Sequence, residues 1–406
     1  MKLLRNGIFL ILVMAMSFLA AVAPSSAASR IRAAQVSYLP SRNYPQVAAE
    51  FARMRRMGLD TVILRVFQRP GDRVYPFVEA RASSGVYFAT DAAPVVADVL
   101  GSLTALAHAA GLKVFAWMTT LSTPLTENGA WHGRRFDPGS GSIMPCKALD
   151  PFRSEVRQRL LDLFRDLARY DIDGVLLQDD LVLRQTEGFS SAALAACLRD
   201  TGRLFSPREL FCKVRRGEDG RVYVSQLGES FQEWAAWKNR YLLKLAADFR
   251  DVARRVRPDL PFAVNLPYEV LTAPDHGLAW FSQDFDRAVE ADFEYIAIMA
   301  YHRQMSAELS LPVEQAIAKV GEMAVSGVRC TRDPARLLLK LQTRDFVSAR
   351  DVAPGELRDI LCAVKGAGDL SLAFFPYHAA LGAMTANRVA WKARSSGNPA
   401  RAGLLE

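Results

Sequence analysis

The stretch Asp173-Gly174-Val175-Leu176-Leu177-Gln178-Asp179-Asp180 joins a short apolar run to two adjacent carboxylates. A run that is apolar on both faces predicts a strand of a parallel sheet that helices cover on both sides. A carboxylate at the carboxyl end of such a strand lies where α/β enzymes build their active sites. The stretch therefore predicts an α/β fold with Asp179 and Asp180 at the carboxyl end of a strand, where the active site would lie.

Outward from this stretch, strand-like apolar runs alternate with amphipathic helix-like segments about eight times. The expected strands lie near residues 33–39, 60–67, 112–118, 173–179, 262–266, 295–301, 336–343 and 371–377. The expected helices lie near residues 44–57, 91–110, 151–170, 231–257, 278–291, 308–325 and 354–365. This alternation predicts a single (β/α)8 TIM barrel.

Three insertions interrupt the alternation, and each follows an expected strand. They cover residues 68–90, 119–148 and 181–230, and the last contains Gly217-Glu218-Asp219-Gly220, which is typical of a turn between short strands. Since loops that follow barrel strands overhang the catalytic face, the sequence predicts long loops that form the walls of a substrate site.

The first residues are typical of a secretory signal peptide. Lys2 and Arg5 precede an apolar segment, and small residues follow near residue 28. We expect a signal peptide over residues 1–28, a barrel domain over 29–390 and a flexible tail over 391–406. No cysteine stands at the cleavage site to accept lipid, and no later segment is long enough to span a membrane, so we expect a periplasmic or secreted protein.

Charge and cysteine content narrow the classes of ligand. The formal net charge is +8, of which +6 remains after removal of the signal peptide. Because the basic residues are scattered and not interleaved with aromatic residues, we do not expect a nucleic-acid partner. The five cysteines are odd in number and lack metal-like spacing, and no paired-histidine motif occurs, so we expect no metal and no cofactor. Cys197 and Cys212 are the most plausible local disulfide pair, and the equal alternative is that both are free.

The expected strand ends carry residues that suit carbohydrate binding. Aromatic faces stack on the apolar faces of sugars, and amide side chains bond to their hydroxyl groups. Bulky core packing is the alternative for the aromatic residues, and the histidines could serve either purpose. The candidate substrate-binding residues are Tyr38, Trp117, Asn265, Tyr301, His302, Gln342 and Tyr377.

Asp179 and Asp180 are the candidate catalytic acids. Consecutive strand residues point to opposite faces, so one of them should face the barrel mouth, although the pattern does not tell which. Glycosidases need a general acid and either a second carboxylate or the acetamido group of the substrate. Glu187 and Glu269 follow strands and are candidates for the second carboxylate. The alternative for the two aspartates is a helix cap or an ion pair with an arginine such as Arg184.

Several blocks in order resemble the C-terminal glycoside-hydrolase domain of periplasmic poly-β-1,6-N-acetylglucosamine deacetylases of the PgaB type. The resemblance spans most of residues 60–380. The blocks begin with Phe115-Ala116-Trp117-Met118, Leu149-Asp150-Pro151-Phe152 and residues 173–180. They continue with Trp234-Ala235-Ala236-Trp237-Lys238, Ala279-Trp280-Phe281, Ile296-Ala297-Ile298-Met299-Ala300, Lys340-Leu341-Gln342 and Phe374-Phe375-Pro376-Tyr377.

This resemblance implies a barrel that cleaves partly de-N-acetylated poly-β-1,6-N-acetylglucosamine within the chain, with the acid in the Asp179-Asp180 pair. Glu187 lies where the family tends to keep a carboxylate. The sequence departs from the family at Gln178, where the family has histidine, and at residues 301–303, where the family has a different continuation. We expect no deacetylase domain in this protein.

Together these observations predict an exported, endo-acting glycoside hydrolase of a hexosamine-containing exopolysaccharide. Two alternatives remain. The barrel could bind the polymer and guide it through export machinery without cleaving it, or it could hydrolyse another amino-sugar glycan.

Overall fold

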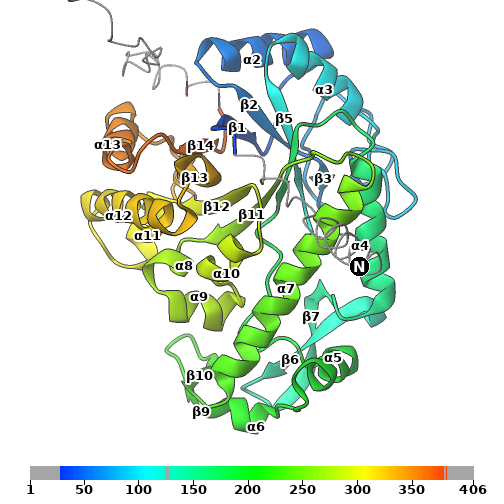
Figure 1. Ribbon diagram of the computed structural model, residues 1–406, viewed down its shortest axis with the longest axis vertical. Helices are drawn as coiled ribbons and strands as arrows, with labels where there is room; N and C mark the ends of the chain where they lie inside the picture. The colour runs from blue at the N-terminus through cyan, green and yellow to red at the C-terminus, as the bar shows by residue number, and fades with distance from the viewer. Residues whose placement is uncertain (1–27, 124–128, 379–380, 382–406) are drawn as a thin grey trace, which may run out of the picture.

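The computed structural model describes residues 28–123, 129–378 and 381 (Figure 1). Residues 1–27 of the predicted signal peptide and all of the predicted tail lie outside the described residues. Among those described, no helix has the length and apolarity that crossing a bilayer requires.

Eight parallel strands close into a barrel, which confirms the predicted fold (Figure 1). The last strand pairs with the first, through partners such as Ala33 and Ala373, and this contact completes the ring. The barrel strands are β1 (Arg32–Val36), β2 (Thr61–Arg65), β5 (Lys113–Met118), β8 (Gly174–Leu177), β11 (Phe262–Pro267), β12 (Tyr295–Ala300), β13 (Leu337–Gln342) and β14 (Ser371–Phe375).

Helices surround the barrel at most of the predicted positions. They are α2 (Tyr44–Arg56), α3 (Leu100–Ala109), α4 (Ser154–Leu167), α7 (Phe231–Arg254), α8 (Glu269–Thr272), α9 (Pro274–Phe281), α10 (Phe285–Glu290), α11 (His302–Glu308), α12 (Val313–Thr331) and α13 (Pro354–Lys365). Three predicted helices were wrong in extent, and the one expected over 308–325 spans Val313–Thr331 instead. The helix expected over 91–110 begins only at Leu100, because Val95 and Val96 bridge to Val86. The helix expected over 278–291 is broken at Ser282, whose φ is +53°.

Side chains fill the inside of the barrel, and a second apolar layer lies between the strands and the helices. The inner plug contains Ile63, Phe115, Leu176 and Leu338. Gly174 is required there, because a Cβ atom at this position would lie 2.5 Å from the Phe115 ring. The glycine before the apolar run therefore lets the strand that leads to the two aspartates pass beside an aromatic ring.

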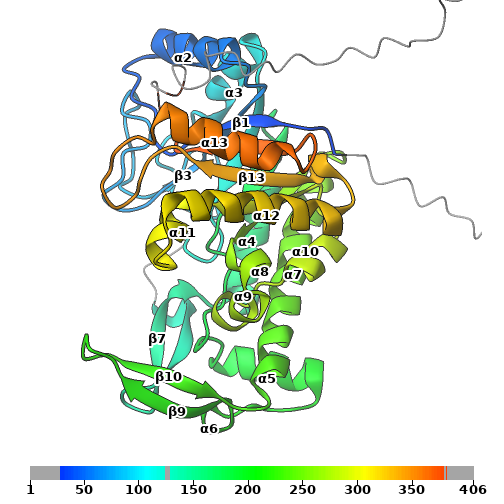
Figure 2. The same ribbon diagram turned by 90° about the vertical axis from the view of Figure 1, so that its left-hand side faces the viewer.

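Two of the three insertions, residues 119–148 and 181–230, form an accessory lobe beyond one end of the barrel (Figures 1 and 2). Its elements are the hairpin of β6 (His132–Asp137) and β7 (Ser142–Leu149), the hairpin of β9 (Phe211–Arg216) and β10 (Val222–Leu227), α5 (Ser191–Thr201), α6 (Pro207–Leu210) and the start of α7. The predicted turn at residues 217–220 joins β9 to β10. The lobe has its own core around Phe189, Phe211, Phe231 and Trp234. All five cysteines are free, so the expected Cys197–Cys212 bridge is absent.

Candidate active site

Asp180 anchors the loop that follows β5. Its side chain is buried and accepts hydrogen bonds from the Thr119 hydroxyl at 2.5 Å, the Thr120 hydroxyl at 2.7 Å, the Thr120 amide at 3.0 Å and the Ser122 amide at 2.9 Å. Both carboxylate oxygens are therefore occupied by donors from one loop. Asp180 holds the wall of the site and does not point its oxygens into open space.

An open pocket of about 620 Å³ is lined by both aspartates, but of the two it is Asp179 that is exposed there. Solvent reaches the residue, although protein surrounds the carboxylate closely enough that desolvation raises its pKa. The positive charge of Lys340 opposes this shift, and the negative charge of Asp180 adds to it. A carboxyl group with a raised pKa holds its proton to higher pH, which suits a general acid.

Lys340 is a buried cation at the floor of the barrel mouth. Its ammonium donates to Asn265 Oδ1 at 3.3 Å and lies 5.4 Å from the centre of the Phe375 ring and 5.7 Å from that of Tyr301. Burial lowers the pKa of Lys340 to about 8, against the attraction of Asp179. Burial, with a contribution from Asp179, raises the pKa of Tyr301. Asn265, Tyr301 and Asp179 are thus brought together around one lysine.

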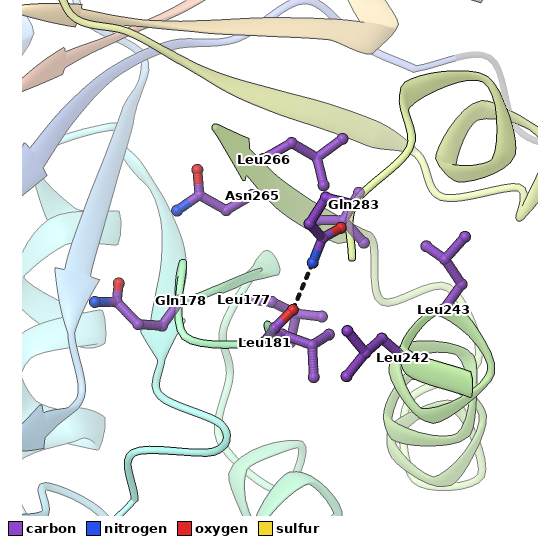
Figure 3. Close-up of a pocket in the computed structure, with 9 residues that line it drawn as sticks. Leu177, Gln178, Leu181, Leu242, Leu243, Asn265, Leu266 and Gln283 are labelled. Carbon is purple, nitrogen blue, oxygen red and sulfur yellow. Dashed lines mark hydrogen bonds between the residues drawn. The ribbon is translucent and has the colours of Figure 1, made fainter. Parts of the chain in front are cut away.

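Trp117 forms another part of the floor of the barrel mouth. Its indole N–H donates to Gln178 Oε1, and its ring lies 5.7 Å from both the Phe67 and the Phe375 rings in edge-on contacts. Figure 3 shows the Gln178 and Asn265 side chains pointing the same way, away from the leucines of α7. Because only 6% of Trp117 is exposed, its ring forms part of the floor and is not an open stacking platform.

A small pocket separates the ends of β8 and β11 (Figure 3). Registered pairing between these strands stops at Leu176 and Ala263. Beyond that point, Gln283 inserts its side chain and its amide N–H donates to the Leu181 carbonyl. A polar wedge therefore replaces backbone pairing beside the strand that leads to Asp179.

Glu187 lines the same open pocket as Asp179. Its Oε2 accepts a 2.8 Å bond from the Arg184 amide. The buried ammonium of Lys238 holds this loop by donating to the carbonyls of Arg184 at 2.9 Å, Glu187 at 3.4 Å and Leu183 at 3.5 Å. Burial lowers the pKa of Lys238 to about 7, opposed by the charge of Glu187. Glu269, the other expected second carboxylate, begins α8 and does not line this pocket.

Of the four other predicted ligands, three have hydrogen-bond partners within the protein and Tyr38 is exposed. Gln342 Oε1 accepts from the Arg303 amide at 3.0 Å at the start of α11. His302 is buried and bonds to Glu356 at 2.5 Å, and burial lowers its pKa. The Tyr377 hydroxyl donates to a carboxylate on α2. Tyr38 is 49% exposed. A role in substrate binding remains a prediction for all four.

Sequence reasoning assigned no role to Lys340 or Lys238. A signal existed for the first, because it is the single charge in the buried strand Leu337–Gln342. The contacts of Lys238 depend on how a distant loop folds over α7, which local pattern does not reveal. Within the described parts of the chain, no cluster of histidine, cysteine, aspartate or glutamate has the arrangement of a metal site.

Comparison with known proteins gives a family match over most of the chain. The model of the family described as Hypothetical glycosyl hydrolase family 13 matches residues 41–375. No curated protein sequence matches significantly.

Solved structures share the fold. The PgaB (BpsB) glycoside hydrolase domain from Bordetella bronchiseptica has a TM-score of 0.68 at 21% identity, over 86% of this chain and 94% of that chain. The catalytic domain of β-amylase from Paenibacillus polymyxa has a TM-score of 0.55 at 12% identity, over 86% and 93%. The β-galactosidase from Marinomonas ef1 has a TM-score of 0.58 at 14% identity, over 85% and 54%. The resemblance seen in the sequence is thereby confirmed.

Proposed function

The chain belongs to Hypothetical glycosyl hydrolase family 13 and is a glycoside hydrolase, and from that premise we propose that Asp179 is the general acid with which it cleaves its glycan. The observation that carries this proposal is the difference between the two adjacent aspartates. Both line the pocket, but Asp180 is buried and occupied by the Thr119–Ser122 loop, whereas Asp179 is exposed and has a raised pKa. Only one of the pair is therefore free to give a proton to a leaving oxygen.

In this mechanism the substrate enters the open pocket, and protonated Asp179 donates to the glycosidic oxygen as the bond breaks. Burial keeps the proton on the acid, and the Lys340 ammonium stabilises the carboxylate that remains after transfer. The lysine thus stabilises ionised Asp179, the state that follows proton transfer, without contacting the sugar.

For the second role we propose Glu187, because it lines the same pocket and its loop is fixed by Lys238. Its carboxylate would act as base or nucleophile. The alternative is an acetamido group of the substrate. A Glu187→Gln variant separates the two routes, because it should lose most activity in the first and retain it in the second. Full activity of this variant would refute the role of Glu187.

The polymer that we propose is a hexosamine-containing exopolysaccharide, with poly-β-1,6-N-acetylglucosamine as the first backbone to test. The resemblance to PgaB-type domains supports this choice. We also propose that cleavage is endo-acting and occurs in the periplasm or outside the cell, beside polysaccharide export machinery. Localisation is tested by N-terminal sequencing of the mature protein, which should begin near residue 29.

Reducing-end release from this polymer tests the function directly. The wild type should release ends, the Asp179→Asn variant should lose activity by about 100-fold or more, and polymer binding should survive this substitution. Binding without any release by the wild type would refute the hydrolase of this polymer and favour a binding role in export.

A further inference from the structure

The pocket that contains Asp179 has positively charged side chains around its opening. Arg69 follows β3 (Phe67–Gln68), Lys147 lies in β7, and Arg184 lies in the loop after β8. All three residues are exposed. Three separate segments thus bring a cation to one opening, and we call Arg69, Lys147 and Arg184 the cationic rim.

The charges of the cationic rim are not neutralised by the protein. Within residues 28–123 and 129–378, no ion pair joins any of the three to a carboxylate, whereas Arg135 in the same pocket pairs with Asp137 at 3.3 Å. Aromatic rings help to place two of the rim side chains. The Arg69 guanidinium lies 5.8 Å from the centre of the Phe67 ring, and that of Arg184 lies 5.8 Å from that of Phe281.

The carboxylates of the pocket take their bonds from other groups. Asp180 accepts from the hydroxyl and amide donors of the Thr119–Ser122 loop, and Glu187 accepts from the backbone amide of Arg184. Asp179 must hold a proton to act as the acid. With Asp179 protonated, the three cations of the rim outnumber the two remaining carboxylates of the pocket, Asp180 and Glu187.

We infer that the cationic rim binds a carboxylate group carried by the polysaccharide, so that the natural substrate is an acidic amino-sugar polymer and not a cationic one. Guanidinium and ammonium groups are suited to recognising carboxylates. A polymer with many free amino groups would be repelled at the same opening. This inference refines the substrate of the proposed function and rests on it.

Three forms of one polymer provide the test. Partly de-N-acetylated poly-β-1,6-N-acetylglucosamine is used as prepared, after re-acetylation, and after succinylation of its amines, which gives cationic, neutral and anionic forms of one backbone. Binding to the full-length Asp179→Asn variant is measured at low ionic strength. The succinylated form should bind about tenfold more tightly than the neutral form, and added salt should reduce this difference.

Variants of the rim decide whether this preference arises at the pocket. Lys147→Glu and Arg184→Glu should abolish it, whereas the control Arg358→Glu, at an exposed site on α13, should retain it. Arg69 is left intact because its charge also acts on Asp179. Equal binding of the three forms, or a preference that both rim variants retain, would overturn the inference. Failure of the wild type to cleave any form would refute the proposed function separately, since the binding comparison needs no turnover.

Discussion

Replacing Asp180 with asparagine should destabilise the protein, whereas the same change at Asp179 should not. At position 180 the carboxylate accepts from two hydroxyl and two amide donors of the Thr119–Ser122 loop. An asparagine presents an N–H group where one of these oxygens lies, and the remaining bonds lose their charge assistance. Bonds to charged groups contribute about 1.5 to 3 kcal/mol each, so we expect a loss of about 3 kcal/mol in the free energy of unfolding.

At position 179 we expect the same substitution to change the free energy of unfolding in the opposite direction. Because the pKa of Asp179 is raised in the folded state, its ionised form is disfavoured by folding, and stability falls as the pH rises through the unfolded and folded pKa values. Asparagine removes this penalty above those values. The Asp179→Asn variant should therefore match or slightly exceed the wild type in stability at neutral pH, while it loses hydrolysis.

Urea unfolding at pH 7 measures the stability of both variants. The comparison with the wild type requires that the dependence of the unfolding free energy on urea concentration is the same for all three proteins. Thr120→Val serves as a matched control, because it removes one donor to Asp180 and leaves the charge in place. It should cost about 1 kcal/mol. The reasoning would be refuted if Asp180→Asn unfolded within about 1 kcal/mol of the wild type, or if Asp179→Asn were the less stable of the two.

Three further substitutions test other parts of the site. Lys340→Met removes the cation that lowers the pKa of Asp179, so the pH at which kcat/KM falls on the alkaline side should move upward; a downward shift would contradict the assignment. Lys238→Met removes the donor to the carbonyls of residues 183–187, so trypsin should cut that loop faster than in the wild type while global unfolding stays close to it. Tyr377→Phe loses a hydrogen bond to α2 and should cost about 1 kcal/mol of stability with unchanged kcat, and a large loss of kcat would place Tyr377 in the site instead.

The barrel could be predicted because each of its strands appears in the sequence as a separate apolar run. Each run is buried on both faces and is therefore almost entirely apolar. Examples are Gly174–Leu177 and Leu337–Gln342. The helix expected at 91–110 was wrong in its first half because the Val86 amide donates to the Pro94 carbonyl and the Val96 amide donates to the Val86 carbonyl. Such a contact between segments is not visible in local periodicity.

The site was less predictable than the fold. Adjacent strand residues were expected to diverge, but which of Asp179 and Asp180 keeps a carboxylate without loop donors depends on a loop about 60 residues earlier in the chain. The partners of Gln342 and His302 are likewise contributed by segments distant from their own strands or helices. Residue type at a strand end therefore indicates a candidate ligand, whereas its actual bonding depends on tertiary contacts.

The short seam between β8 and β11 leaves Asp179 with unequal backbone support on its two sides. That seam has two registered residue pairs, whereas β8 has four with β5 on its other side. Hydrogen exchange near residues 177–181 should accordingly be faster than in the neighbouring β5. The backbone before Asp179 is thus held mainly from the β5 side, and on the β11 side the bond from Gln283 to the Leu181 carbonyl takes the place of strand pairing.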